Sequence, residues 1–324
     1  GEPSLLPNVG RGKFNSTAVS TMKNPILVIF GGSDHEEQAA RKVCKDHDIW
    51  TATATVNGTK CHAGNAYQAN GYVIDGATDF NVDGADCIIF ECNAAAAGGQ
   101  EVVGRCDHHN PGDPGYALGP DRFWEASSLG QLCSILGVSP TEGLLMVAAG
   151  DHCPAAAYKG LCPGVDAQKF KTHRIAGLAT AWLAGVSPTD GYPIYADDSE
   201  QVEKAIDFAT KLIRLAPESS FVGVKDLRQY GKIDQLPEAA LIAGYAYISQ
   251  IPDTDRDGNP TGNVKINLGG DNSPETVKAV MEWLNRHPSG MAPAYGVPSR
   301  GFAGRVFKSV HLPDPSMHTY YDSL

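Results

Sequence analysis

The residues best suited to chemistry lie in the segment RCDHHNPGDPGY, residues 105–116, where Asp107 is followed directly by His108 and His109. Carboxylate and imidazole groups are the ligands that manganese, magnesium, iron and zinc take in proteins. The prolines and glycines after the histidines are typical of a rigid turn. Two interpretations therefore stand side by side: a metal-binding corner of an enzyme and a polar turn.

Further acids follow other apolar segments in the N-terminal half of the chain. Asp34 and Glu36 come after PILVIF, Glu91 comes after CIIF, and Asp151 comes after LLMVAAG. A single acid at such a place is more often a helix cap or turn former than a ligand, and Ser33 with Glu36 fits a capping box. Acids that recur after several apolar segments are harder to explain as caps or turns alone. Carboxylates gathered together repel one another unless a cation neutralises them.

Strand and helix patterns alternate through the same half. Strands are predicted at 25–30, 51–56, 86–92 and 101–106, and helices at 33–48, 121–136 and 141–149. This order is typical of an α/β fold with a parallel sheet and flanking helices. Ligands collect beyond the carboxyl ends of the strands in such sheets, which is where the acids and histidines fall.

The C-terminal half begins with a turn-rich stretch at 186–199 and an amphipathic helix at 200–216. A hairpin at 239–268, a helix at 273–286 and a strand near 301–310 indicate a smaller α+β domain. The expected parts are an N-terminal extension at 1–24, a metal-binding α/β domain at 25–190, a linker with a connecting helix at 191–220, and the α+β domain at 221–324. Within the hairpin, DTDRDG resembles the start of a calcium loop, but a turn between strands is favoured over it.

Composition narrows the class of partner. Acidic residues outnumber basic ones by 37 to 26, which disfavours a long nucleic acid and leaves small substrates or metals. No run of roughly 18 apolar residues is present, so no membrane partner and a cytoplasmic location are expected. The 8 cysteines are too sparse for a disulfide scaffold and are expected to be mostly reduced. A homodimer is compatible with the sequence.

The order of these segments resembles that of the DHH phosphoesterases, a superfamily of single-strand exonucleases, nano-RNases, cyclic-dinucleotide phosphodiesterases and manganese pyrophosphatases. The tripeptide at 107–109 is the one that names the family, and the resemblance covers roughly residues 25–155. It implies a site that binds one or two divalent metals, manganese first and magnesium, iron or zinc as alternatives. The implied metal ligands are Asp34, Glu36, Glu91, His108 and Asp151.

The same resemblance assigns roles around the metal. Asp107, His108 and His109 are the implied catalytic residues, with Asp107 orienting the imidazole and His109 meeting the substrate phosphate. The segment at 286–305 loosely resembles the family's glycine-rich, basic closing segment, in which Arg300 and Arg305 would bind phosphate; solvated loop arginines are the alternative. The expected reaction is hydrolysis of a phosphodiester or phosphate ester of a small nucleotide-like substrate, or of a short oligonucleotide, by a metal-activated water.

The sequence departs from the family pattern in ways that keep other functions open. Glutamate replaces aspartate at Glu36 and Glu91, and Phe30 stands where a polar group often precedes the first motif. A catalytically inactive relative that binds a ligand or a protein partner is the main alternative. A zinc hydrolase with cysteine ligands is another, because Cys92, Cys106 and Cys153 each lie within two residues of an expected metal-site residue.

Overall fold

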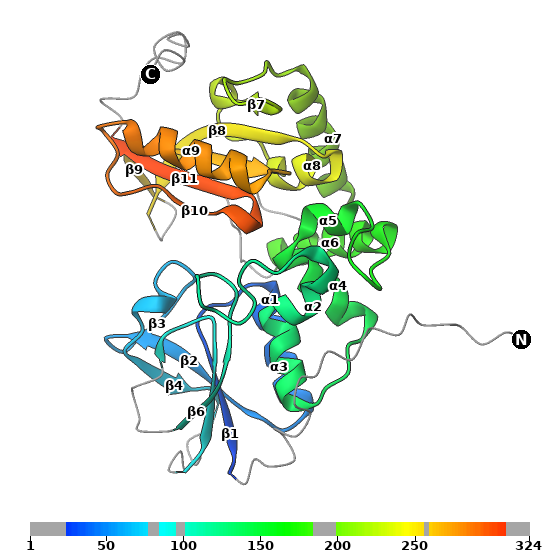
Figure 1. Cartoon of the computed structure of the whole chain (residues 1–324), viewed down its shortest axis with the longest axis vertical. Helices are drawn as coiled ribbons and strands as arrows, with labels where there is room; N and C mark the ends of the chain where they lie inside the picture. The colour runs from blue at the N-terminus through cyan, green and yellow to red at the C-terminus, as the bar shows by residue number, and fades with distance from the viewer. Residues whose placement is uncertain (1–23, 77–83, 95–100, 184–198, 256–258, 309–324) are drawn as a thin grey trace, which may run out of the picture. The chain divides into compact units, whose positions relative to one another are not determined.

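The computed structural model describes residues 24–76, 84–94, 101–183, 199–255 and 259–308 (Figure 1). The chain divides into two compact units, Gly1–Phe170 and Lys171–Leu324. Each unit combines a mixed β-sheet with helices, so the α/β class is confirmed at this level. Within the described ranges, no helix is both long and apolar enough to cross a lipid bilayer.

The sheet of the first unit has a parallel centre with antiparallel additions. Its strands are β1 (Ile26–Phe30), β2 (Trp50–Val56), β3 (Thr59–Lys60), β4 (Gly71–Ile74), β5 (Asp86–Phe90) and β6 (Glu101–Cys106). In the order β2, β1, β5, β6 the neighbouring strands run parallel, whereas β3 and β4 each pair antiparallel with β2. The expected parallel sheet is therefore a mixed one. The chain reverses at Asn57 and Gly58, which both have positive φ, as in the tight turns that join hairpin strands.

Helices cover one face of this sheet. They are α1 (His35–Asp46), α2 (Phe123–Ala126), α3 (Ser128–Leu136), α4 (Glu142–His152) and α5 (Pro154–Tyr158), with η4 (Pro120–Arg122) ahead of α2. Figure 1 shows α1 and α3 running alongside the strands. Phe30 and Phe90 point from β1 and β5 into the core shared with these helices. Ile29 and Ile89 point to the opposite face, so the two central strands are buried on both sides.

The single helix expected at 121–136 is instead broken after α2. Ser127 adopts an extended backbone, and its side chain accepts a hydrogen bond from the amide of Gly130, which caps a new helix, α3. Gly130 is required there because a Cβ atom would lie 1.8 Å from the carbonyl oxygen of Trp124. The break creates a helix N-terminus at Ser128 inside the unit, where the side chains of Ser127 and Ser128 are fully buried.

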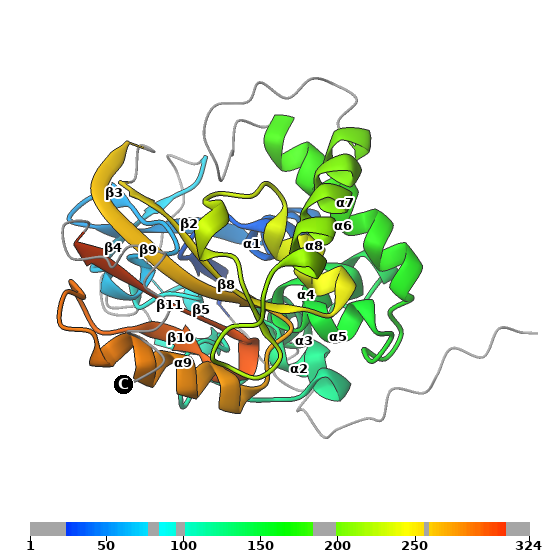
Figure 2. The same ribbon diagram turned by 90° about the horizontal axis from the view of Figure 1, so that it is seen from above.

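The second unit has a mostly antiparallel sheet in the order β10, β11, β9, β8, β7. Its strands are β7 (Val224–Asp226), β8 (Ala246–Thr254), β9 (Pro260–Gly270), β10 (Tyr295–Val297) and β11 (Phe302–Lys308), and only β7 and β8 pair parallel. The helical segments are α7 (Ser199–Leu215), η5 (Arg228–Tyr230), α8 (Leu236–Ala243), α9 (Pro274–Arg286) and η6 (Pro298–Arg300), while α6 (Ala167–Leu183) runs across the division between the units. Figure 2 shows β8 and β9 as the long strands of this sheet. α9 packs against it through Val277, Val280 and Leu284.

Two expectations for this half change in detail. The helix expected to connect two domains, α7, buries Val202, Ile206 and Ile213 in a core with α8, so it belongs to the second unit; residues 191–198 of the expected linker lie outside the described ranges. The first arm of the expected hairpin is partly helical, because residues up to Ala243 belong to α8. The flanks of DTDRDG are antiparallel strands, as the favoured hairpin requires, and the amide of Asp255 donates to the carbonyl of Asn259; residues 256–258 lie outside the described ranges.

The close approach of two strand ends at Gly31 yields a test of this packing. A Cβ atom on Gly31 would lie 2.3 Å from the carbonyl oxygen of Glu91 and 2.9 Å from the Cβ atoms of Ala66 and Cys92. We therefore expect Gly31→Ala to destabilise the protein by about 1–3 kcal/mol, seen as a lower urea midpoint of unfolding. The control is Gly143→Ala in α4, where nothing lies within 4 Å of the added carbon and alanine favours the helix. Equal effects of the two substitutions would contradict this account.

Candidate metal centre

Four of the side chains predicted as metal ligands meet in one cluster. Glu36, Glu91, His108 and Asp151 each place one ligand atom so that these atoms all lie within 4.8 Å of one another. Glu36 comes from the first turn of α1 and Glu91 directly follows β5. His108 follows β6 after one intervening residue, and Asp151 lies in the last turn of α4. The expected convergence of these four residues is therefore present in the fold.

Glu36 is the most deeply buried carboxylate of the cluster. Its side chain is 1% exposed, and its Oε1 atom accepts a hydrogen bond of 3.0 Å from the amide of Leu129. Its Oε2 atom is buried and has no hydrogen-bond partner among the described residues. Burial raises the pKa of the Glu36 carboxyl well above its ordinary value of 4.5, and the charges of Asp151 and Glu91 raise it further. A buried carboxylate oxygen without a hydrogen bond, beside two other acids, is suited to bind a cation.

The N-terminus of α3 holds two of the three carboxylates of the cluster. The amide of Leu129 donates to Glu36, and the hydroxyl of Ser128 donates to Oε1 of Glu91 over 2.7 Å. The first amides of a helix have no partner within the helix, and its N-terminal end favours negative charge. The break after Ser127 therefore supplies the site with donors.

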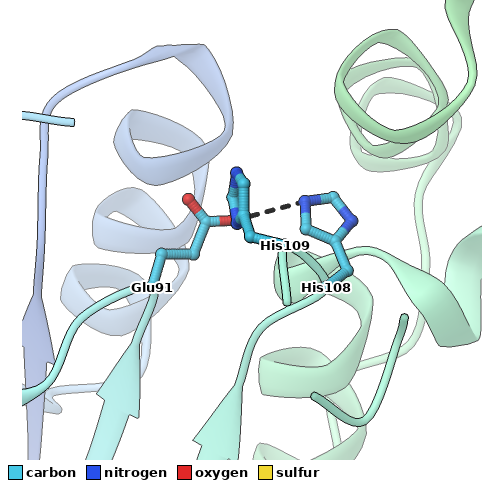
Figure 3. A group of neighbouring side chains, drawn as sticks. All are labelled: Glu91, His108 and His109. Atoms are coloured by element: carbon cyan, nitrogen blue, oxygen red, sulfur yellow. Dashed lines mark ion pairs between the residues drawn. The ribbon is translucent and has the colours of Figure 1, made fainter. Parts of the chain in front are cut away.

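Glu91 connects the two histidines. Its Oε1 atom lies 3.4 Å from Nε2 of His108 and 3.8 Å from Nδ1 of His109. Figure 3 shows the carboxylate of Glu91 pointing toward the ring of His108, with the ring of His109 beside it. Glu91 has a φ of 50°, a left-handed conformation that is uncommon for a residue other than glycine. The turn after β5 thus adopts an unusual backbone at the residue that faces both imidazoles.

The ring of His108 lies between an acid and a second histidine. Its Nε2 atom is 3.0 Å from Oδ2 of Asp151, and its Nδ1 atom is 2.9 Å from Nδ1 of His152. The two rings stack with centroids 5.1 Å apart, and Nε2 of His152 lies 2.9 Å from the carbonyl oxygen of Leu118. His152 adjoins Asp151 in the sequence, and this adjacency is the only sequence signal that could have pointed to it.

Asp107 orients a different ring from the one expected. Its carboxylate accepts hydrogen bonds from Nδ1 of His109 at 3.0 Å, from the amide of His108 at 2.8 Å and from the hydroxyl of Tyr67 at 3.0 Å. Burial raises the pKa of Asp107, but the hydrogen bonds and charge of His109, together with the hydrogen bond from Tyr67, lower it to about 2. Asp107 is therefore an anion that holds the ring of His109. The ring of His108 is instead turned toward His152 and Asp151.

Asp34, the fifth expected ligand, is not part of the cluster. It is the exposed N-cap residue of α1, and its side chain accepts a hydrogen bond of 2.8 Å from the amide of Glu37. The capping pair is therefore Asp34 with Glu37, one residue later than the expected pair of Ser33 and Glu36. This register places Glu36 on the inner side of the helix and leaves Asp34 outside.

The two arginines expected to bind phosphate differ in environment. Arg305 is 9% exposed, and its guanidinium donates to the carbonyl oxygens of Leu284, His287 and Ala292. Its Nε and Nη1 donors are thus used within the second unit, which argues against the expected phosphate contact. Arg300 is half-buried in η6, and its role as a phosphate contact stays a prediction.

Cysteine ligands receive no support from the geometry. All of the cysteines are free thiols, as expected, and neither group of neighbouring ligand atoms contains one. Cys106 is fully buried, and burial raises the pKa of its thiol well above the ordinary value, which disfavours the thiolate that zinc needs.

Comparison with family models and with curated proteins finds no relative of this chain. No model of a known protein family matches the chain, and no curated protein has a sequence significantly similar to it.

The cluster has the composition and charge of a divalent cation site. With the histidine neutral and all three carboxylates ionised, it would carry three negative charges in a largely buried space. Oxygen ligands from Glu36, Glu91 and Asp151 with one imidazole nitrogen suit manganese, magnesium, iron or zinc. A second group, formed by Glu91, His108 and His109, shares two of its residues with the first. The two groups could therefore hold one ion or two.

The raised pKa of Glu36 predicts how the metal-free protein responds to pH. Because the folded-state pKa of Glu36 lies above 4.5, the contribution of its neutral carboxyl to the free energy of unfolding is complete below pH 4.5. This contribution is lost as pH rises through the folded-state pKa. We expect Glu36→Gln to remove this loss and to stabilise the metal-free protein near pH 8 by about 1–3 kcal/mol. Urea unfolding in the presence of a chelator, between about pH 4 and pH 8, measures this difference.

Glu203→Gln is the matched control, since Glu203 is exposed on α7. It should leave the pH profile of stability unchanged. If the stability of Glu36→Gln fell with rising pH as steeply as that of the unsubstituted protein, ionisation of Glu36 would not be the cause of the loss.

Proposed function

We propose that this protein is a divalent-metal-dependent phosphoesterase that hydrolyses a phosphodiester or phosphate ester of a small, nucleotide-like substrate. The observation that carries the proposal is the meeting of Glu36, Glu91, His108 and Asp151, where one buried carboxylate oxygen has no hydrogen-bond partner in the described part of the chain. The order of these residues along the chain, each after a strand or an apolar helix, is the order that resembles the DHH phosphoesterases.

These four residues would hold the metal. Manganese is the proposed ion, with magnesium, iron or zinc as alternatives, because the donor set is mostly oxygen with one imidazole. A bound divalent ion would lower the pKa of a coordinated water and stabilise negative charge on phosphoryl oxygens.

The surrounding residues position a substrate phosphate. Asp107 is ionised and binds Nδ1 of His109, so the ring is held with Nε2 available on its other side. An imidazole with protons on both nitrogens can bond Asp107 through Nδ1 and donate from Nε2 to a phosphate oxygen. His109 is 28% exposed, whereas His108 is 0% exposed, which suits a substrate contact for the first and a ligand role for the second.

The chain's charge favours a short substrate. A net charge of −11 repels a long polyanion, while a single phosphate can be drawn to a local cation. The substrate proposed is therefore a mononucleotide-like phosphodiester or a short oligonucleotide.

A non-catalytic relative is the second candidate, because glutamate stands at two positions where the family pattern has aspartate. Glu91 reaches the histidines only with a left-handed backbone, an unusual arrangement compatible with a site that has been rebuilt. Such a protein would bind a ligand or a protein partner through the same fold.

Binding and hydrolysis of a simple phosphodiester test the proposal together. We expect isothermal titration calorimetry with Mn²⁺ to show binding to the full-length protein and none to His108→Ala. The Mn²⁺-loaded protein should hydrolyse bis-p-nitrophenyl phosphate or a dinucleotide, and His108→Ala should hydrolyse neither. At a metal concentration about 100 times the Kd, Mn²⁺ should stabilise the folded protein by about 2.7 kcal/mol.

His47→Ala is the control, because His47 is exposed at the end of α1 and should leave binding and hydrolysis unchanged. Mn²⁺ binding without hydrolysis of either substrate would favour the non-catalytic relative. Absence of binding would refute the metal site.

A further inference from the structure

We propose that His152 is a positioning residue that fixes the tautomer of His108, so that the Nε2 lone pair of His108 faces the metal site. This inference rests on the proposed function, because it concerns how one of its ligands is prepared. It assigns a role to a histidine that follows an expected ligand and has no role of its own in the resemblance.

The carbonyl of Leu118 determines the direction of the hydrogen bonds. A carbonyl oxygen can only accept, so the 2.9 Å contact requires a proton on Nε2 of His152. A neutral His152 ring then has a lone pair at Nδ1. That atom lies 2.9 Å from Nδ1 of His108, which must therefore donate. The opposite direction would need a proton on both nitrogens of His152, and so a positive charge on a ring that is 5% exposed.

This hydrogen-bond direction decides whether the other nitrogen of His108, Nε2, carries a proton or a lone pair. When Nδ1 carries the proton of a neutral ring, Nε2 has a lone pair. Nε2 lies 3.0 Å from Oδ2 of Asp151 and 3.4 Å from Oε1 of Glu91, which are acceptors when ionised. A lone pair facing two carboxylates is repulsive by itself and becomes favourable when a cation lies between them. Ligating histidines commonly have the other ring nitrogen bonded in this way.

The proline- and glycine-rich turn after His109, residues 110–118, positions the carbonyl oxygen of Leu118. The amide of Gly115 donates to the carbonyl of Asp107 over 3.0 Å, and the amide of Leu118 donates to the carbonyl of Gly115 over 3.4 Å. Gly115 has to be a glycine, since a Cβ atom would lie 1.9 Å from the carbonyl oxygen of Ala126. The turn therefore connects Asp107 and His108 to the acceptor that fixes His152.

Two substitutions separate hydrogen bonding from packing. His152→Phe keeps a stacking ring and removes the acceptor, whereas His152→Asn is smaller and keeps an acceptor close to the position of Nδ1. We expect the affinity for Mn²⁺, measured by calorimetry on the full-length protein, to fall by about 10–100-fold in His152→Phe. His152→Asn should recover most of that loss. Thermal unfolding of the metal-free variants checks that both are folded.

Nuclear magnetic resonance of the unsubstituted protein tests the tautomer without any variant. In the ¹⁵N-labelled, Zn²⁺-loaded protein we expect the His108 proton on Nδ1 and a scalar coupling across the hydrogen bond to Nδ1 of His152. A proton on Nε2 of His108, or Mn²⁺ binding to His152→Phe as tight as to the unsubstituted protein, would overturn the role of His152 and leave the metal site intact. An unsubstituted protein that binds no divalent metal would refute the proposed function and the role of His152 with it.

Discussion

Mutual repulsion among three carboxylates around one buried imidazole is the interaction that the rest of the first unit must offset. Glu36, Glu91 and Asp151 approach His108 in a space from which water is largely excluded, and Glu36 has an oxygen with no partner among the described residues. Charges placed this way destabilise a folded chain unless donors or a cation lie close by. The donors present are at the N-terminus of α3, and a divalent cation would balance the remaining charge.

The fold brings these groups together through ordinary packing. β1 and β5 are apolar on both faces and must be covered on both, which fixes the positions of α1 and the turn after β5. β6 pairs parallel with β5, so its carboxyl end delivers His108 beside Glu91. α4 packs into the same core and carries Asp151 and His152 at its end. The site therefore forms where independent elements end, as is general in sheets with a parallel centre.

Much of this arrangement could be predicted from local patterns, because apolar runs determine strands and polar residues at their ends meet at one edge. The choice between Asp34 and Glu36 could not, since a shift of one residue in the helix cap decides which acid points inward. The helix break at Ser127 was hidden by a continuous helical pattern, and it depends on the close contact of Gly130 with Trp124. The roles of His152 and Arg305 depend on carbonyl oxygens distant in sequence, which no local spacing reveals.

The most direct test of the central claim is an anomalous-scattering map from crystals of the full-length protein soaked with Mn²⁺. We expect a peak surrounded by carboxylate oxygens of Glu36, Glu91 and Asp151 and by Nε2 of His108. A map at saturating Mn²⁺ with no peak there, while the four side chains remain clustered, would contradict the claim that a metal ion neutralises this cluster.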